Sequence, residues 1–284
     1  MATLTIRLSL ALAALTFAGC TGGGEDTGKD TEETDTDTDT DTDTDTDTDT
    51  DTDTDTATTY NVAGTAMDFP TMAPVAEGLC VVAVDPGPAI TGGEPTVLGT
   101  TTVGAAGAFT LSGLAEKPSL GLVVIVQDCA GEGTVYATGT GISSATIGAL
   151  GDGETYSDAR AFSIATTTRD GLVASFGAAG GTWDPSTQGI LMGFVFDNAG
   201  APVGGATVTG AGATTYYMDT DSADGLFTSS AGVNAATDAA ASAVFAIPNA
   251  PITTYTAAAE GYEFDTLTGG SLPGMALFVA FYAL

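Results

Sequence analysis

The chain of 284 residues contains no histidine, only five lysine and arginine residues together, and 7% aromatic residues. Without histidine, a Ser-His-Asp triad, a Cys-His dyad and a histidine-ligated zinc site are excluded. Beyond Ala57, 20 acidic residues stand against only Lys117, Arg160 and Arg169, an excess of 17 negative charges. Because such an excess repels phosphate groups, we expect no nucleic-acid partner.

An uninterrupted run of Asp-Thr dipeptides occupies residues 35–56. The run has no apolar side chain to bury, and its carboxylates repel one another at every second position. We therefore expect a disordered, extended spacer, about 70 Å long if it were fully stretched. With the residues before it, this run makes up a predicted acidic linker over residues 20–57.

Residues 1–19 have the composition of a signal peptide. Arg7 is the basic residue, an apolar core covers residues 8–17, and small residues follow. At this length the core is too short for a membrane-spanning helix. The segment therefore predicts export.

The signal ends in Phe17-Ala18-Gly19-Cys20. This ending resembles the lipobox of bacterial lipoproteins, with Phe17 where Leu, Val or Ile is usual. The resemblance implies cleavage before Cys20 and a lipid anchor on Cys20, including palmitate. Thr21 stands where the inner-membrane retention signal has Asp, which implies the outer membrane, with the periplasmic or the surface face left open. The alternative is an ordinary secretory signal followed by an incidental cysteine.

Two further cysteines, Cys80 and Cys129, remain if Cys20 carries lipid. An even pair in an exported protein favours a disulfide. The alternative is two buried free thiols.

Short apolar stretches separated by Gly, Pro and Asp turns predict β-strands in the first part of the folded region. The stretch 120–126 is nearly continuously apolar, which favours a strand buried on both faces. These strands form a predicted first module over residues 58–140. The predicted strands cover residues 60–68, 79–84, 95–102, 108–111 and 120–127.

Residues 141–188 are expected to form a connector with one short helix. Thr168 is the expected N-cap, Asp170 lies in the expected first turn, and Gly177 is the expected stop signal. One face of this helix would be apolar and pack against the modules. Its residues are Leu172, Val173 and Phe176.

The stretch 193–208 reads GFVFDNAGAPVGGATV. Residues 198–200 supply a turn, Pro202 fixes its exit, and Ala206 and Val208 alternate onto one face of a strand. This pattern resembles the carboxypeptidase regulatory-like repeat. The resemblance implies a transthyretin-like β-sandwich for the second module, residues 189–284. Later pieces resemble the same family, namely residues 224–227, residues 245–250 and Gly261-Tyr262.

The segment 276–284 alternates apolar side chains and predicts a last sandwich strand with Leu277, Val279 and Phe281 on one face. The predicted fold class is therefore mainly β. It consists of two tandem Ig-like or transthyretin-like β-sandwich modules with a short connecting helix, preceded by the disordered Asp-Thr tether.

The loop 219–225 has the oxygen density of a calcium site, with Asp219, Asp221 and Asp224 as candidate ligands. Its spacing departs from the calcium-loop pattern by one residue, so a simple turn is the preferred interpretation. No metal, cofactor or catalytic residue is expected.

Two functions remain open. The first is a non-catalytic, lipid-anchored envelope protein that presents its modules for binding an envelope protein or glycan, or for a structural role. The alternative is a secreted hydrolase that uses carboxylates, alone or with calcium. A pair of carboxylates in one pocket would favour the second.

Overall fold

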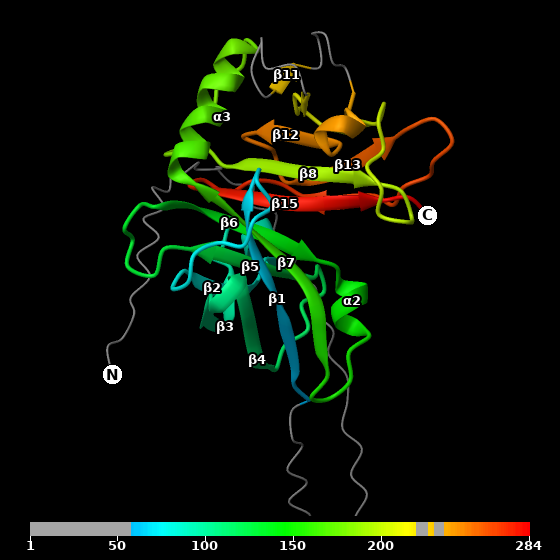
Figure 1. Ribbon diagram of the computed structural model, residues 1–284. Coiled ribbons are helices and arrows are strands. Elements are labelled where there is room, and N and C mark those ends of the chain that lie inside the picture. The colour runs from blue at the N-terminus through cyan, green and yellow to red at the C-terminus, as the bar shows by residue number, and fades with distance from the viewer. Residues whose placement is uncertain (1–57, 220–226, 230–235) are drawn as a thin grey trace, which may run out of the picture. The chain divides into compact units, whose positions relative to one another are not determined.

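Seven strands in two facing layers enclose a first hydrophobic core (Figure 1). The computed structural model describes residues 58–219, 227–229 and 236–284. One layer has the strand order β4-β1-β7, and the other has the order β3-β2-β5-β6. The strands are β1 (Tyr60–Phe69), β2 (Cys80–Asp85), β3 (Thr96–Thr102), β4 (Ala108–Leu114), β5 (Leu122–Gln127), β6 (Val135–Ile142) and β7 (Thr155–Ala165).

Strand β5 has the two buried faces that its apolar run predicts. Leu122, Val124 and Val126 belong to the core between the two layers. Val123, on the opposite face, packs with valines of β2 in a small separate cluster. Successive side chains of a strand point to opposite sides, so an unbroken apolar run is needed where both sides are covered.

The second half of the described chain also forms two layers. Strands β11-β10-β12-β8-β15 make one layer, and β14-β13-β9 make the other. The strands are β8 (Ile190–Phe196), β9 (Thr207–Gly210), β10 (Tyr216–Met218), β11 (Phe227–Ser229), β12 (Val244–Pro248), β13 (Thr253–Ala258), β14 (Leu267–Gly269) and β15 (Met275–Tyr282).

Strand β15 joins the two halves into one sheet. It pairs in parallel with β8 on one edge and with β6 on the other, so the sheet continues from β11 to β3. The expected apolar face is present, because Val279 and Phe281 are buried in the second core and Leu277 packs against it. The other face is also apolar, since Ala276 and Phe278 belong to a third core. The last strand is therefore central, with partners on both edges and on both faces.

Helix α3 (Thr166–Ala178) contributes to this third core. Leu172 and Phe176 are fully buried, and Val173 packs against the same cluster, as the apolar face predicted. Aromatic rings from both halves of the chain meet here. Phe278 of β15 lies 4.7 Å from Phe162 and 5.2 Å from Phe69 between ring centroids.

The boundaries of α3 differ from the expected ones. Thr168 is not the N-cap, because β7 leads directly into the helix, which begins at Thr166. The Thr166 N–H donates to the carbonyl of Thr134 at 3.0 Å, a partner that stands in for a capping side chain. Asp170 consequently lies beyond the first turn, and Gly177 lies inside the helix.

The remaining helical segments are single turns. They are α1 (Gly87–Ile90), α2 (Ser144–Gly148), η1 (Ala105–Gly107) and η2 (Ala239–Ala241). In α2 the Ser143 side chain accepts a hydrogen bond from the Thr146 N–H at 3.1 Å, a regular N-cap. None of the helices in the described part of the chain has the length and hydrophobicity of a membrane-spanning segment.

A disulfide joins Cys80, the first residue of β2, to Cys129 in the loop after β5. The two Cα atoms are 4.9 Å apart, because β2 and β5 are neighbouring strands. Closing a loop of 49 residues stabilises the folded state by about 4 kcal/mol in the chain-entropy account.

The expected mainly β fold with sandwich packing is confirmed. The module boundaries 58–140, 141–188 and 189–284 stay predictions. The stretch expected as a connector contains α2, the whole of β7, and α3, and β7 pairs in parallel along β1. The predicted Asp-Thr tether lies outside the described residues.

Gly193 lies where the backbone of one neighbouring strand and a ring of the other leave no room for a side chain. It lies in β8 opposite Val279 of β15 and Phe245 of β12. A Cβ atom added there would lie 2.5 Å from the Val279 carbonyl oxygen and 2.6 Å from the Phe245 ring. The missing side chain therefore makes room for the ring.

We expect Gly193→Ala to lower the free energy of unfolding by about 1–3 kcal/mol, because backbone or ring must shift. The matched control is Gly171→Ala, on the exposed side of α3, where a new Cβ meets nothing within 4 Å. Removing a helical glycine should raise stability there by about 0.5–1 kcal/mol. Urea unfolding of both variants tests this, and equal effects would contradict the packing at Gly193.

Candidate functional site

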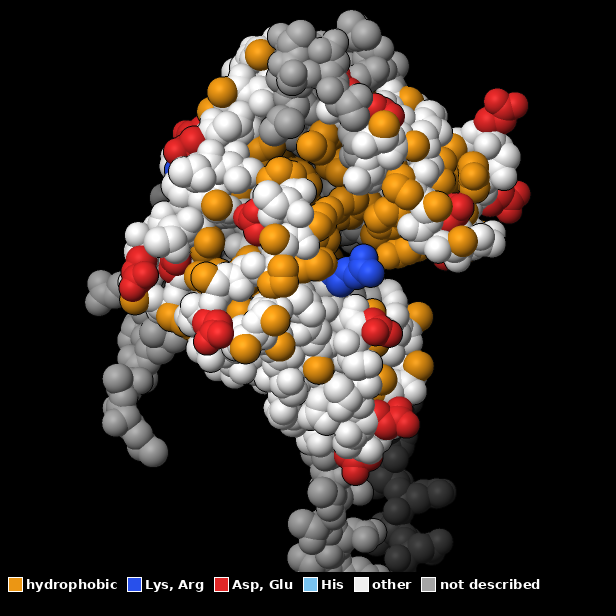
Figure 2. Space-filling view, viewed as in Figure 1, with side chains coloured by type: hydrophobic (Ala, Val, Ile, Leu, Met, Phe, Trp, Pro, Cys, Tyr) orange, Lys and Arg blue, Asp and Glu red, His pale blue; other side chains and the backbone are white. Residues whose placement is uncertain are grey.

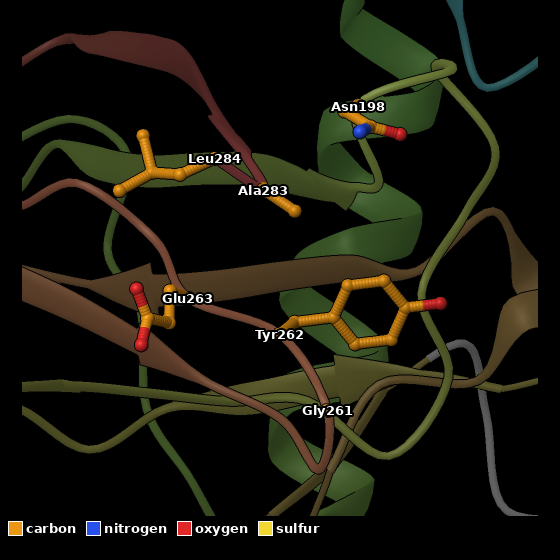
Figure 3. A pocket seen from close by; sticks show the side chains of 6 residues that line it. All are labelled: Asn198, Gly261, Tyr262, Glu263, Ala283 and Leu284. Carbon is orange, nitrogen blue, oxygen red and sulfur yellow. The ribbon is translucent and has the colours of Figure 1, made fainter.

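Two turns and the C-terminal segment of the second half line a hollow on the surface of the described structure. Asn198 comes from the turn after β8, and Tyr262 and Glu263 come from the turn after β13 (Figure 3). The hollow has a volume of about 650 Å³. We call it the C-terminal hollow. Its lining consists of Asn198, Gly261, Tyr262, Glu263, Ala283 and Leu284.

The turn that carries Asn198 is fixed by its neighbour. The Asp197 carboxylate accepts hydrogen bonds from the backbone N–H groups of Ala199 at 2.9 Å and Ala201 at 2.8 Å. Gly200 follows with a φ of 80°, a conformation that favours glycine. Pro202 then bridges back to Phe196. The turn expected at residues 198–200 is therefore present.

Backbone hydrogen bonds tie the other two loops together. The Ala283 N–H donates to the Phe196 carbonyl, and the Leu284 N–H donates to the Glu263 carbonyl, both at 2.9 Å. Tyr262 turns back on Ala259 through its N–H at 3.2 Å. The hollow thus has a frame of backbone hydrogen bonds.

The side chains offered in the C-terminal hollow are one ring, one amide and one carboxylate. The Tyr262 ring is 43% exposed and lies 6.2 Å from the Phe264 ring between centroids. Neither Asn198 nor Glu263 makes a side-chain hydrogen bond to any residue that the structure describes. A ring face with unengaged polar groups suits binding. A single carboxylate does not make the acid and base pair of a glycosidase.

Another hollow is smaller and is lined by apolar residues together with Asp219 and Ser242. It measures about 220 Å³ and lies beside the turn after β1. Hydrophobic side chains gather on this side of the molecule over β8, β12 and β15 (Figure 2). The lining consists of Phe69, Pro70, Met72, Met218, Asp219, Ala240, Ser242 and Val244.

The calcium candidates divide between described and undescribed residues. Asp219 follows β10 and is buried, with 8% of its surface exposed. Asp221, Asp224 and the predicted lipidation site Cys20 lie outside the described residues. Within residues 58–219, 227–229 and 236–284, no three Cys, Asp or Glu side chains gather as a metal site would require.

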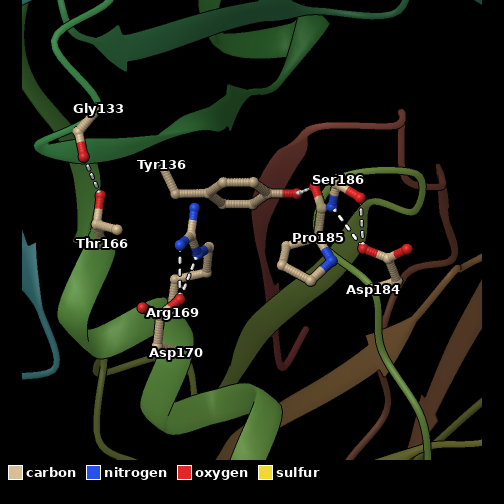
Figure 4. Close-up of polar contacts among 8 residues, drawn as sticks. All are labelled: Gly133, Tyr136, Thr166, Arg169, Asp170, Asp184, Pro185 and Ser186. Carbon is tan, nitrogen blue, oxygen red and sulfur yellow. Dashed lines mark hydrogen bonds and ion pairs between the residues drawn. The ribbon is translucent and has the colours of Figure 1, made fainter.

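Tyr136 of β6 forms a polar contact network that has a structural role (Figure 4). Its hydroxyl donates to the carbonyl oxygens of Pro185 at 3.1 Å and Gln188 at 3.2 Å. Burial raises the pKa of Tyr136 above its usual range. The Arg169 guanidinium lies 5.9 Å from the ring centroid and pairs with Asp170 at 2.6 Å.

The Asp184 carboxylate holds the loop beside Tyr136. It accepts hydrogen bonds from the Ser186 hydroxyl at 2.6 Å, the Ser186 N–H at 3.0 Å and the Thr187 hydroxyl at 2.9 Å. These bonds, those from Ser186 first, lower the pKa of Asp184. A carboxylate fully engaged in its own turn is a structural element.

No protein-family model matches this sequence, and no curated protein sequence matches it either. Among solved structures, the shaft pilin SpaA from Lactobacillus rhamnosus GG is 11% identical over 80% of this chain and 98% of its own, with a TM-score of 0.24. A streptococcal ancillary pilin is 12% identical over 81% of this chain and 64% of its own, with a TM-score of 0.24. A minor pilin of Streptococcus agalactiae is 9% identical over 79% of this chain and 95% of its own, with a TM-score of 0.22. Values of this size assign neither a family nor a function.

Asp128 fixes the loop between β5 and β6, next to the disulfide. Its carboxylate accepts hydrogen bonds from the Thr134 N–H at 2.8 Å, the Val135 N–H at 3.2 Å and the Thr134 hydroxyl. Partial burial raises the pKa of Asp128. The hydrogen bonds from the Thr134 side chain and from the backbone of residues 133–135 together outweigh burial and leave the pKa lowered.

This shift predicts an acid-sensitive contribution to stability. A carboxyl whose pKa is lower in the folded state stabilises the fold above its unfolded pKa of about 3.9, and the contribution is lost as the pH falls below it. We expect Asp128→Asn to lower the free energy of unfolding at pH 7 and to reduce its further loss between about pH 5 and pH 3. Urea unfolding across this range checks it. Parallel pH profiles for the two proteins would contradict the assignment.

Proposed function

We propose that this protein is a lipid-anchored, non-catalytic protein of the bacterial cell envelope that binds a partner through its folded region. The proposal of an anchor is supported by the signal-like segment 1–19, which ends in Ala18-Gly19-Cys20. Cys20 would carry the lipid, including palmitate. Position 21 is Thr, whereas the inner-membrane retention signal has Asp there, and this difference favours the outer membrane.

The linker 20–57 would serve as a spacer between the anchor and the folded region. Its 22-residue Asp-Thr run repels itself and an anionic membrane surface. Such a spacer would hold the β-sandwich region away from the lipid. The relation to the carboxypeptidase regulatory-like repeat stays part of this proposal.

The observation that carries the binding function is the lining of the C-terminal hollow. It combines an exposed ring, an unengaged amide and one carboxylate on a frame of backbone hydrogen bonds. The alternative, a carboxylate-dependent hydrolase, requires two carboxyl groups across one site. The C-terminal hollow has one carboxylate in its lining, Glu263, and the smaller hollow beside the turn after β1 also has one, Asp219. Binding of an envelope protein or glycan without turnover is the better fit.

The anchor is tested with Cys20→Ser. We expect the unsubstituted protein to incorporate a palmitate analogue and to fractionate with the outer membrane, and the variant to remain unlabelled and either unprocessed or soluble. The matched control is Cys80→Ser combined with Cys129→Ser, which makes the same chemical change and leaves the label in place. A processed Cys20→Ser variant that still carries the label would overturn the anchor.

The absence of turnover is tested by incubating the purified protein with soluble envelope glycans and proteins. We expect these molecules to keep their mass, as measured by mass spectrometry, whether they bind or not. Shortened products that disappear with Glu263→Gln would contradict the non-catalytic function. They would support the hydrolase instead.

A further inference from the structure

We propose that the C-terminal hollow binds the cationic side chain, lysine or arginine, of a partner polypeptide. The inference rests on the proposed binding function and adds the chemistry of the ligand. Three independent observations lead to it, namely the charge of the folded region, the exposed ring of Tyr262 and the unengaged carboxylate of Glu263.

The folded region carries a negative charge that its own residues barely compensate. Three basic residues stand against 20 acidic ones beyond Ala57. The one ion pair recorded between described residues joins Arg169 to Asp170. Lys117 is directed to the backbone carbonyls of Gly148 and Leu150. Figure 2 shows acidic side chains spread over one face of the molecule and very few basic ones. A field of this sign concentrates cationic partners near the surface.

Tyr262 supplies a ring face for a cation. It is 43% exposed at the rim of the hollow, and Phe264 lies beside it with the two rings inclined by 31°. A packed neighbour restricts the ring without covering it. An ammonium or guanidinium over an exposed tyrosine face is attracted by the ring quadrupole.

Glu263 and Asn198 supply the polar partners. The carboxylate oxygens of Glu263 are acceptors, and its side chain makes no hydrogen bond within the described part of the chain. Figure 3 shows Asn198, Tyr262 and Glu263 at separate places along the border of the hollow, with the Tyr262 ring and the Glu263 carboxylate at opposite ends of it. A charge-assisted hydrogen bond from a basic side chain would satisfy the Glu263 carboxylate. The volume of about 650 Å³ accommodates such a side chain together with the backbone that bears it.

A neutral glycan is the competing ligand. Its hydroxyl groups could bond to Asn198 and Glu263, and a sugar ring could lie on Tyr262. A neutral glycan would gain no binding free energy from the excess of negative charge, which is the most pronounced feature of the folded region. We therefore assign the hollow to a cation and include the glycan as an outcome of the test.

The experiment compares two peptides that differ in charge alone. The full-length protein, in an uncharged detergent at low salt, is titrated with acetyl-Gly-Arg-Gly-amide and with the same peptide containing citrulline, followed by ligand-observed NMR. We expect the arginine peptide to bind about 5- to 10-fold more tightly. A single positive charge per peptide limits attraction to the acidic linker, which is identical in every variant.

Four variants locate the binding. Glu263→Gln and Tyr262→Leu should each lower the affinity for the arginine peptide about fivefold. Tyr262→Phe keeps the ring face and should change this affinity little. Glu132→Gln, in the loop between β5 and β6 and outside the lining, removes the same charge and should have no effect. Thermal melting confirms that each variant is folded before the comparison is made.

Each outcome decides the proposal. If Glu132→Gln and Glu263→Gln lower the affinity for the arginine peptide equally, the attraction is general and the site is overturned. If the citrulline peptide binds as tightly as the arginine peptide, the positive charge is not what is recognised and the cation is overturned. Tyr262-dependent binding of a neutral oligosaccharide, with no preference for arginine, would overturn the cation and leave the binding function standing. If neither peptide nor oligosaccharide binds, the site and the binding function both fail.

Discussion

Strand β15 is hydrogen-bonded along both edges and buried on both faces, and the rest of the described structure depends on these contacts. It satisfies the backbone groups along one edge of β6 and one edge of β8, and each of these edges would otherwise be open over the paired residues. Phe278 fills the core under α3, and Phe281 fills the core of the second sandwich. One strand therefore couples two sandwiches that are formed by successive parts of the chain.

Local pattern was enough to predict much of this fold, because strand faces have a period of two. The alternation around Val279 and the unbroken run in β5 both gave the correct burial. Pairing partners were not predictable in the same way. Nothing near β15 specifies parallel contact with β6, which lies more than 130 positions earlier. The start of α3 shows the same limit, since the carbonyl of Thr134 replaces the expected cap at Thr168.

The candidate site was visible in the sequence only as separate turns. Asn198 belonged to the turn before Pro202, and Tyr262 to a Gly-Tyr pair, but Glu263 was one acidic residue among many. What creates a hollow is the convergence of these turns on Leu284, which β15 brings to them. The hollow exists only once the strands that carry these turns are assembled. The one signal that could have indicated the site is the pair of aromatic residues, Tyr262 and Phe264, within the acidic stretch 260–265 of a sequence poor in aromatics.

Because β15 follows all of its partner strands in the sequence, it also determines when the sheet can be completed during synthesis or export. A polypeptide that emerges from its N-terminus, from a ribosome or through a translocation channel, exposes β6 and β8 long before their shared partner appears. The edges of β6 and β8 that β15 covers stay unpaired until the last strand is released. Assembly of the whole region is thereby deferred to one late event, and the intermediate that precedes it carries two unpaired edges open to other extended chains.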